Sequence, residues 1–410
     1  MKHTKLILFT IVSLIFTDSV RYISWSGTLN IDSATYICAL LNYISLSIFI
    51  FIASTSYSKD LIPFSIRSWY KIWLLWLIFN LIRGAFLSQN YWDWKFLLLE
   101  SMFFSFVPLA YFLGQDLDIV KFIFKFIISY LFAFGFLFIP LTLITNPELY
   151  SRLMIPIGLF ILFIPYLKSK WKLLVIIVAL TSMLMVLDFR SNILKIGFSV
   201  MLLPIYYFRK FIGKNLIRWA HLILFALPLV LFILAVSGVY NVFEKASDNE
   251  GFTVADSQGG EEESLTADTR TFLYVEVLSS LNNSGNLLIG ESASGKYKTD
   301  YFDLVEGNGN YRYGSEVGIL NILLYHGVIG VVIYFFLLLT VSYVAIYQSN
   351  NILSKMLGLF IAFRWTFSFV EEFTQFDLNF YIFWIIVGLV SSATFRNMND
   401  DEVKNYLKLE

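Results

Sequence analysis

Long apolar runs separated by short polar turns recur along almost the whole chain. A transmembrane helix needs about 20 mainly apolar residues, and reading the chain for runs of this length predicts about twelve spans. Their expected bounds are 5–24, 34–55, 70–88, 95–114, 119–143, 152–168, 170–188, 190–208, 216–237, 316–347, 352–371 and 376–395. The pattern therefore predicts an all-α polytopic membrane protein.

One long polar stretch, residues 239–315, interrupts this pattern after the ninth span. It carries 13 acidic and 5 basic side chains, and its first part, up to Ala267, has the composition of a flexible segment. Asp268 can cap a helix, so a helix through about Leu281 is predicted. A turn over 282–285 and a short extended piece over 286–290 are expected to follow. The expected organisation is 1–238 for transmembrane helices 1 to 9, 239–315 for the loop, 316–395 for helices 10 to 12, and 396–410 for a tail.

Composition agrees with a membrane protein. Hydrophobic residues make up 58% of the chain and charged residues 15%, against roughly 25% in an average soluble protein. This excludes a soluble globular enzyme and a disordered chain, and the single Cys38 excludes an intrachain disulfide. The formal net charge of zero gives no indication of a nucleic-acid partner. Walker-type, dinucleotide-binding and Cys/His metal-binding patterns are absent, so we expect no cofactor and no metal.

The basic residues beside the spans predict the orientation. With the N-terminus in the cytoplasm, 18 of the 30 Lys and Arg residues lie on the cytoplasmic side. Five of the other 12 lie in the long loop, where the rule has little force. The first run follows Lys2 and Lys5 as in a signal peptide, but Asp18 and Arg21 follow it in place of a cleavage site, so an uncleaved helix is expected. Both termini are therefore predicted to be cytoplasmic, with the loop outside.

Several basic side chains are expected in the outer half of the membrane. They are Arg83, Arg190, Lys195 and Arg364. An ionisable group at that depth costs at least about 2.5–3.5 kcal/mol, so it usually has a partner or a function. As a set they form a cationic zone that suits an anionic, lipid-linked ligand, particularly a pyrophosphate, because Arg binds phosphate with two parallel hydrogen bonds.

The alternative is that these residues are interfacial anchors or members of internal ion pairs. Asp188 is close to Arg190 in the sequence, and Glu371 follows Arg364 by seven residues, which in a helix would place the two on one face. The anchor interpretation is preferred for Arg21 and Arg152, which are expected at loop edges.

The end of the loop contains a second candidate group. Asn308, Tyr311, Arg312 and Tyr313 precede Glu316, and aromatic and amide side chains of this kind stack on sugar rings and bind their hydroxyls. An ordinary polar loop end is the alternative. Residues 316–326 are expected either as one or two helical turns above the membrane or as part of one long tilted helix, and His326 is expected to be structural.

Three groups of short motifs resemble the O-antigen polymerase and ligase superfamily, the bacterial membrane proteins that join lipid-linked glycans. They are Phe189-Arg190-Ser191; Asp268-Thr269-Arg270 followed by Leu288-Ile289-Gly290; and Glu316-Val317-Gly318-Ile319-Leu320 followed by Gly327-Val328-Ile329-Gly330. Their order, and the large loop about two-thirds of the way along the chain, extend the resemblance over roughly residues 185–345. The resemblance implies a transferase at the outer face of the bacterial cytoplasmic membrane that acts on polyprenyl-pyrophosphate-linked oligosaccharides. A flippase and a chain-length regulator of the same pathway are the expected partners, besides membrane lipid.

The resemblance favours a Wzy-type polymerase over a ligase. In the ligases a His typically stands about eleven residues before a Gly-rich turn, whereas Glu316 occupies that position before Gly327 here. In the expected reaction a hydroxyl attacks the anomeric carbon while charge builds on the leaving pyrophosphate, which fixed cations stabilise. We expect Arg190 and Arg270 to supply this charge, and Glu316, with Glu371 or Glu372 behind it, to accept the proton. The expected substrate-binding residues are Arg83, Lys195, Asn308, Tyr311, Arg312, Tyr313, Arg364 and Glu371.

Other functions stay open at this point. A ligase would move finished glycan to a lipid or protein acceptor. A flippase or secondary transporter should show two related halves with interrupted helices at matching positions. The single large acidic loop makes the two halves of the chain unlike each other, which favours an enzyme over a transporter. A structural scaffold would not explain the intramembrane Arg residues.

Overall fold

The described part of the chain is mostly helical in the computed structural model. The structure describes residues 3–25, 32–55, 62–142, 148–185, 190–236, 253–254, 263–264, 271–299, 310–372 and 375–407. Helical segments overlap every apolar run that the sequence predicts. Seven of the described helical stretches are long and apolar enough to cross a membrane: Thr4–Ser24, Thr35–Thr55, Phe64–Leu87, Tyr91–Gly114, Leu117–Phe138, Asn215–Leu234 and Gly318–Tyr347. These stretches indicate a multi-pass membrane protein.

The first part of the chain alternates long helices with shorter, irregular ones. Its elements are α1 (Thr4–Trp25), α2 (Asp32–Thr55), α3 (Phe64–Leu87), α4 (Tyr91–Phe96), the π-helical turn η1 (Leu97–Ser101), α5 (Met102–Phe106), η2 (Val107–Ala110), α6 (Tyr111–Gly114), α7 (Leu117–Phe126), the π-helical η3 (Ile127–Phe132), α8 (Ala133–Gly135), η4 (Phe136–Phe138), α9 (Ile139–Thr142), α10 (Glu148–Leu153), α11 (Ile157–Phe160), η5 (Ile161–Tyr166), α12 (Ser169–Leu184), α13 (Arg190–Tyr207) and α14 (Lys214–Val236). Proline accounts for part of the irregularity, because Pro108 lies in the 3₁₀ turn η2 and Pro165 in η5.

The remaining elements are the described parts of the loop and the C-terminal helices. They are β1 (Thr253–Val254), β2 (Glu263–Ser264), α16 (Thr271–Ser284), β3 (Tyr297–Lys298), β4 (Tyr311–Arg312), α17 (Gly318–Tyr347), α18 (Ile352–Phe367), α19 (Leu378–Ser391), α20 (Ala393–Asn397) and α21 (Asp400–Tyr406). The strands form two antiparallel pairs of two residues each, β1 with β2 and β3 with β4.

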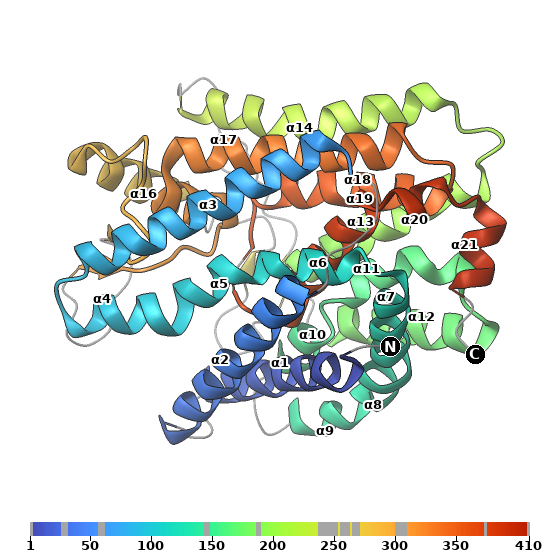
Figure 1. Ribbon diagram of the computed structural model, residues 1–410, viewed down its shortest axis with the longest axis horizontal. Helices are drawn as coiled ribbons and strands as arrows, with labels where there is room; N and C mark the ends of the chain where they lie inside the picture. The colour runs from blue at the N-terminus through green and yellow to red at the C-terminus, as the bar shows by residue number, and fades with distance from the viewer. Residues whose placement is uncertain are drawn as a thin grey trace.

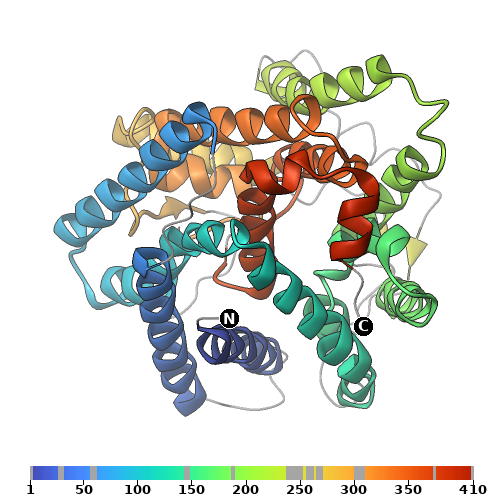
Figure 2. The same cartoon turned by 45° about the vertical axis from the view of Figure 1, so that its right-hand side comes forward.

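The helices form a bundle around α18 and α19. α17 packs against α3 and α18, and α19 packs against α6. α19 and α6 approach each other closely: a Cβ added at Gly388 would collide with the Tyr111 carbonyl and the Gly114 backbone, so only glycine fits there. α14 runs along the outer edge of the bundle in Figures 1 and 2 and exposes Leu222 and Ile233, as expected of a helix that faces lipid. The loop helix α16 and the start of α4 lie at one end of the molecule in Figure 1, away from both chain termini.

α17 is broken at Gly327, and the loop is hydrogen-bonded into the break. Gly327 has φ +66° and ψ −173°, values that no helix contains. The N–H groups of Val328 and Ile329, which lose their helical partners, donate to the carbonyls of Leu287 and Leu288 at 3.0 and 3.2 Å. In return the Leu324 carbonyl accepts a hydrogen bond from the N–H of Glu291 at 2.7 Å. A short helix therefore precedes the break, as in the first of the two alternatives, and the second alternative, one continuous helix, is wrong.

The loop predictions have mixed outcomes. α16 lies where a helix was predicted, although its expected cap, Asp268, lies outside the described residues, as does nearly all of the stretch predicted to be flexible. The expected extended piece over 286–290 is wrong: this segment is a turn, in which the Gly290 N–H donates to the Asn286 carbonyl at 2.7 Å. Gly290 has φ +76°, a conformation open to glycine and incompatible with a strand.

The break predicts a specific sensitivity to side chains at residue 327. Gly327→Ala should lower the free energy of unfolding by more than about 1–3 kcal/mol, because the residue would be strained at positive φ and its Cβ would collide with the Leu288 carbonyl. The matched control is Gly197→Ala within α13, where nothing lies within 4 Å of the added Cβ. Thermal unfolding in detergent measures both variants. Equal melting temperatures for the two would contradict the role of the break.

Candidate functional site

Arg83 fixes the loop to α3. Its guanidinium donates to the carbonyls of Ile289 and Gly290, both at 3.0 Å, and to Asn80 Oδ1 at 2.9 Å. The Trp76 indole N–H, on the same helix, donates to the His326 carbonyl at 3.1 Å, next to the break in α17. Arg83, which was predicted to bind substrate, therefore has its donors directed at the backbone of the loop.

Asp93 in α4 fixes the end of the loop. Its carboxylate accepts hydrogen bonds from Lys296 Nζ at 2.9 Å, from the Tyr313 hydroxyl at 2.6 Å and from the Gln89 N–H at 3.0 Å. The Tyr313 ring also stacks on Phe96, with the ring centroids 4.9 Å apart. Lys296 directly precedes β3 and Tyr313 directly follows β4, so Asp93 holds this strand pair against α4.

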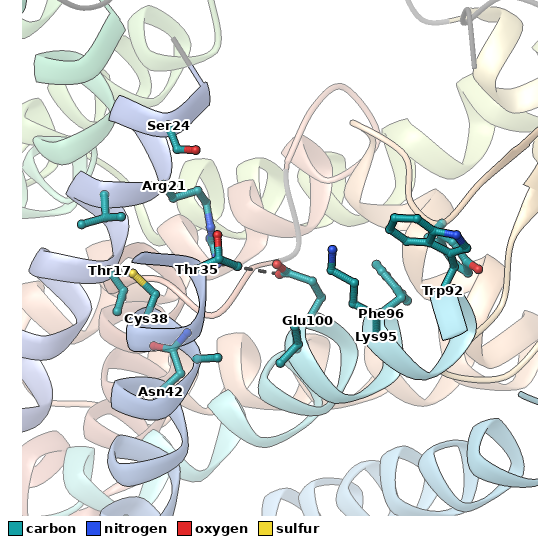
Figure 3. Close-up of a pocket in the computed structure, with 14 residues that line it drawn as sticks. Thr17, Arg21, Ser24, Thr35, Cys38, Asn42, Trp92, Lys95, Phe96 and Glu100 are labelled. Carbon is teal, nitrogen blue, oxygen red and sulfur yellow. Dashed lines mark ion pairs between the residues drawn. The ribbon is translucent and has the colours of Figure 1, made fainter. Parts of the chain in front are cut away.

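A cavity of about 320 Å³ lies between α1, α2 and the α4–η1 segment; we call it the helix-side cavity. It is lined by Thr17, Val20, Arg21, Ser24, Thr35, Cys38, Ala39, Asn42, Trp92, Lys95, Phe96, Leu99, Glu100 and Tyr313. In Figure 3 Arg21 reaches from α1 toward Glu100, and Lys95 points into the gap between Glu100 and Trp92. Lys95 Nζ lies 4.8 Å from the centre of the Trp92 ring. Two cations, one carboxylate and an aromatic ring thus border the same space.

A second cavity of about 310 Å³ lies on the other side of Arg21 and Glu100, against the end of the loop; we call it the loop-side cavity. It is lined by Arg21, Phe96, Glu100, Ser101, Phe104, Arg312, Gly314, Ser315, Asn321, Tyr325 and Gln375. Arg21, Phe96 and Glu100 belong to both cavities. The two cavities therefore adjoin at these three side chains.

The ion pair at this junction is weak and accessible. Arg21 Nη2 and Glu100 Oε2 are 3.7 Å apart, and their side chains are 28% and 50% exposed. A pair of this exposure contributes about 0–1 kcal/mol. Arg21 Nη1 also donates to Gln375 Oε1 at 2.8 Å, which keeps the guanidinium at the junction. Both side chains of the pair are therefore accessible from the cavities that they border.

Arg312 borders the loop-side cavity within the β3–β4 ladder. Its Nη2 lies 3.4 Å from Glu316 Oε1, four residues further along the chain. Burial raises the pKa of the neighbouring Tyr297 to about 12, although Arg312 opposes the shift. Tyr297 therefore remains a neutral phenol, and its hydroxyl donates to the Gly314 carbonyl at 3.5 Å. Arg312 is the predicted substrate-binding cation that the described structure brings to the wall of the loop-side cavity.

A third group of charges is buried between α13, α18 and α19. Arg364 forms an ion pair with Glu372 and donates to Asn379 Oδ1 at 2.9 Å. Lys195, only 6% exposed, borders with Arg364 a small cavity of about 10 Å³, roughly the space of one water molecule. The helical spacing expected for Arg364 and Glu371 does not apply, because α18 ends at Phe367 and the chain turns before residue 371.

The remaining predicted residues are distributed as follows. Glu316 is half-buried beside Arg312, and its backbone carbonyl accepts the Glu372 N–H at 3.0 Å. Tyr311 is exposed, with Lys296 Nζ 5.6 Å from the centre of its ring. Arg190 is the first residue of α13, but its side chain is not among the described ones. Arg270 and Asn308 lie outside the described residues.

Sequence reasoning missed Lys95, Glu100 and Gln375, and treated Arg21 as an interfacial anchor. Lys95 and Glu100 are five residues apart, and in a regular α-helix such residues point about 140° apart. The π-helical turn η1 widens the helix between them, so both reach the helix-side cavity. The usable signal was the pairing of opposite charges at the start of one apolar run.

No family model, no curated protein and no solved structure matches the chain. Within the described ranges, no group of three or more His, Cys, Asp and Glu side chains is placed to hold a metal ion.

The contacts of Arg83 predict how the loop responds to its loss. Arg83→Gln should accelerate hydrogen exchange of the amides of residues 287–294 at least about 10-fold, since each hydrogen bond from a charged group contributes about 1.5–3 kcal/mol. Arg67→Gln, an exposed Arg at the other end of α3, is the matched control and should leave these amides unchanged. Hydrogen–deuterium exchange with mass spectrometry measures both. Unchanged exchange in Arg83→Gln would contradict the anchoring role.

Proposed function

We propose that the protein is a membrane glycosyltransferase that polymerises polyprenyl-pyrophosphate-linked oligosaccharide repeat units. The observation that carries the proposal is the pair of cavities that adjoin at Arg21 and Glu100. Polymerisation brings two large substrates together at one bond, so it needs two adjoining spaces with reactive groups at their junction.

The two cavities differ in chemistry. The helix-side cavity has two cations, Arg21 and Lys95, and lies among helices that have the length and hydropathy of membrane spans. This combination suits a phosphorylated head group on an apolar chain, because fixed cations stabilise the charge that builds on a leaving pyrophosphate. The loop-side cavity is lined by Ser101, Ser315 and Gln375, whose hydroxyl and amide groups suit sugar hydroxyls.

The proposal includes a topology. The helical segments make twelve crossings, both termini lie in the cytoplasm and the long loop lies at the outer face of the bacterial cytoplasmic membrane. The excess of Lys and Arg on the cytoplasmic side supports this orientation. Figure 1, in which α16 lies at the left edge and both termini lie in the right half, also supports it.

Two of the motifs that resemble the O-antigen polymerase and ligase superfamily are in contact with each other. The segment Leu288–Gly290 crosses α17 at Gly327, where Leu288 accepts a backbone hydrogen bond from Ile329. This contact supports a common role for the motifs in shaping the loop end. Arg190 and Arg270 remain the proposed additional cations for the pyrophosphate, and Glu316 remains a candidate to accept the proton.

Purified protein in liposomes tests the proposal. The substrate is the lipid-linked oligosaccharide extracted from source cells that lack this gene. The expected product is a ladder of glycans of increasing length on the lipid carrier. A substrate that stays unextended, or glycan that moves only to another lipid or to protein, would contradict a polymerase.

Arg21→Gln should slow elongation about 10²- to 10³-fold, the usual effect of removing one group that stabilises transition-state charge. Arg67→Gln, which lies outside both cavities, is the control and should elongate at the wild-type rate. Quantifying the ladder over time measures both variants. Elongation at the wild-type rate by a folded Arg21→Gln protein would remove Arg21 from the reaction.

A further inference from the structure

Glu100 has a position in the helix that regular geometry would not give it. It belongs to η1, a π-helical turn between the α-helical segments α4 and α5. Such π-helical turns are rare in proteins, and those that occur are often found at functional sites. Here the insertion brings the carboxylate to the wall that the two cavities share, on the same side as Lys95. We propose that Glu100 is the general base of the transfer reaction, an inference that rests on the proposed function.

Glu100 is also the more available of the candidate carboxylates. Glu372 is 5% exposed and is engaged by the buried Arg364. Glu316 is 29% exposed, pairs with Arg312 and lines neither cavity. Glu100 is half-exposed and pairs with Arg21 at 3.7 Å, a distance beyond that of a direct hydrogen bond. A carboxylate that is held loosely at the junction is free to accept a proton.

The neighbours of Glu100 assign a role to each cavity. Arg21 and Lys95 make the helix-side cavity the site for the pyrophosphate of the donor, the growing chain on its lipid. Ser101, Ser315 and Gln375 make the loop-side cavity the site for the terminal sugar of the acceptor, the incoming repeat unit. When the pyrophosphate binds Arg21, it releases Glu100 toward the acceptor hydroxyl.

The chemical step then balances without another reactant. The acceptor hydroxyl oxygen forms a bond to the anomeric carbon of the donor, and its proton passes to the Glu100 carboxylate. The bond between the anomeric carbon and the pyrophosphate oxygen breaks, and its electron pair leaves with the polyprenyl pyrophosphate. Arg21 and Lys95 stabilise the charge that appears on that oxygen.

Single-turnover elongation in liposomes tests this role. Glu100→Gln keeps the size and polarity of the side chain but cannot accept the proton, so the rate should fall about 10²- to 10⁴-fold. Glu276→Gln is the matched control: Glu276 lies in α16, accepts a hydrogen bond from Thr299 at 3.1 Å and lines neither cavity. It should elongate at the wild-type rate.

Donor binding is measured separately through Cys38, which lines the helix-side cavity and is the only cysteine of the chain. Farnesyl pyrophosphate should slow the reaction of Cys38 with a maleimide in the wild type and equally in Glu100→Gln. Arg21→Gln should lose this protection. A general base acts in the chemical step and not in donor binding. The Glu100→Gln variant should therefore elongate slowly but still bind the donor.

Three outcomes would overturn the inference. Elongation by Glu100→Gln at a rate near that of the wild type would do so while the proposed function stands. Loss of both elongation and Cys38 protection in Glu100→Gln would make Glu100 a binding residue. A wild-type protein that forms no ladder would overturn the proposed function and the inference with it.

Discussion

The hydrogen bonds that fill the break in α17 hold the rest of the site in place. In an apolar environment each unpaired backbone group costs several kcal/mol, so a helix can open only where other groups replace its lost bonds. The segment from Leu287 to Glu291 provides these groups, and Gly290 and Gly327 allow the two backbones to approach. Once this segment is fixed, Arg83 and Asp93 hold the loop against α3 and α4, and its end forms one wall of the loop-side cavity.

The charged groups differ in how firmly they are held, and this difference matters for function. Arg364 and Glu372 are buried together, and separating them would leave a buried charge without a partner, so this pair stabilises one arrangement of α18 and the segment that follows it. Arg21 and Glu100 are partly exposed at a cavity junction and can exchange partners. The buried pair therefore suits a structural role, whereas the junction pair suits chemistry with a charged ligand.

Much of the fold could be predicted from the sequence, because apolar runs of about twenty residues are the direct sequence signal of membrane-spanning helices. The site could be predicted only in part. Arg312 and Tyr313 were found because they lie close together in the sequence, but the role of Arg83 depends on backbone carbonyls more than two hundred residues away. Glu100 was missed because its direction depends on a π-helical turn, which leaves no periodic signal. Arg190 and Arg270 remain predictions that the described structure does not test.

An experimental structure with a bound polyprenyl-pyrophosphate would test the central claim most directly. We expect the pyrophosphate between Arg21 and Lys95, with its first prenyl units against α1 and α2 and the Glu100 carboxylate turned toward the loop-side cavity. A pyrophosphate bound elsewhere, for example beside Lys195 and Arg364, with the Arg21–Glu100 pair intact, would contradict the claim that the reaction takes place at this junction.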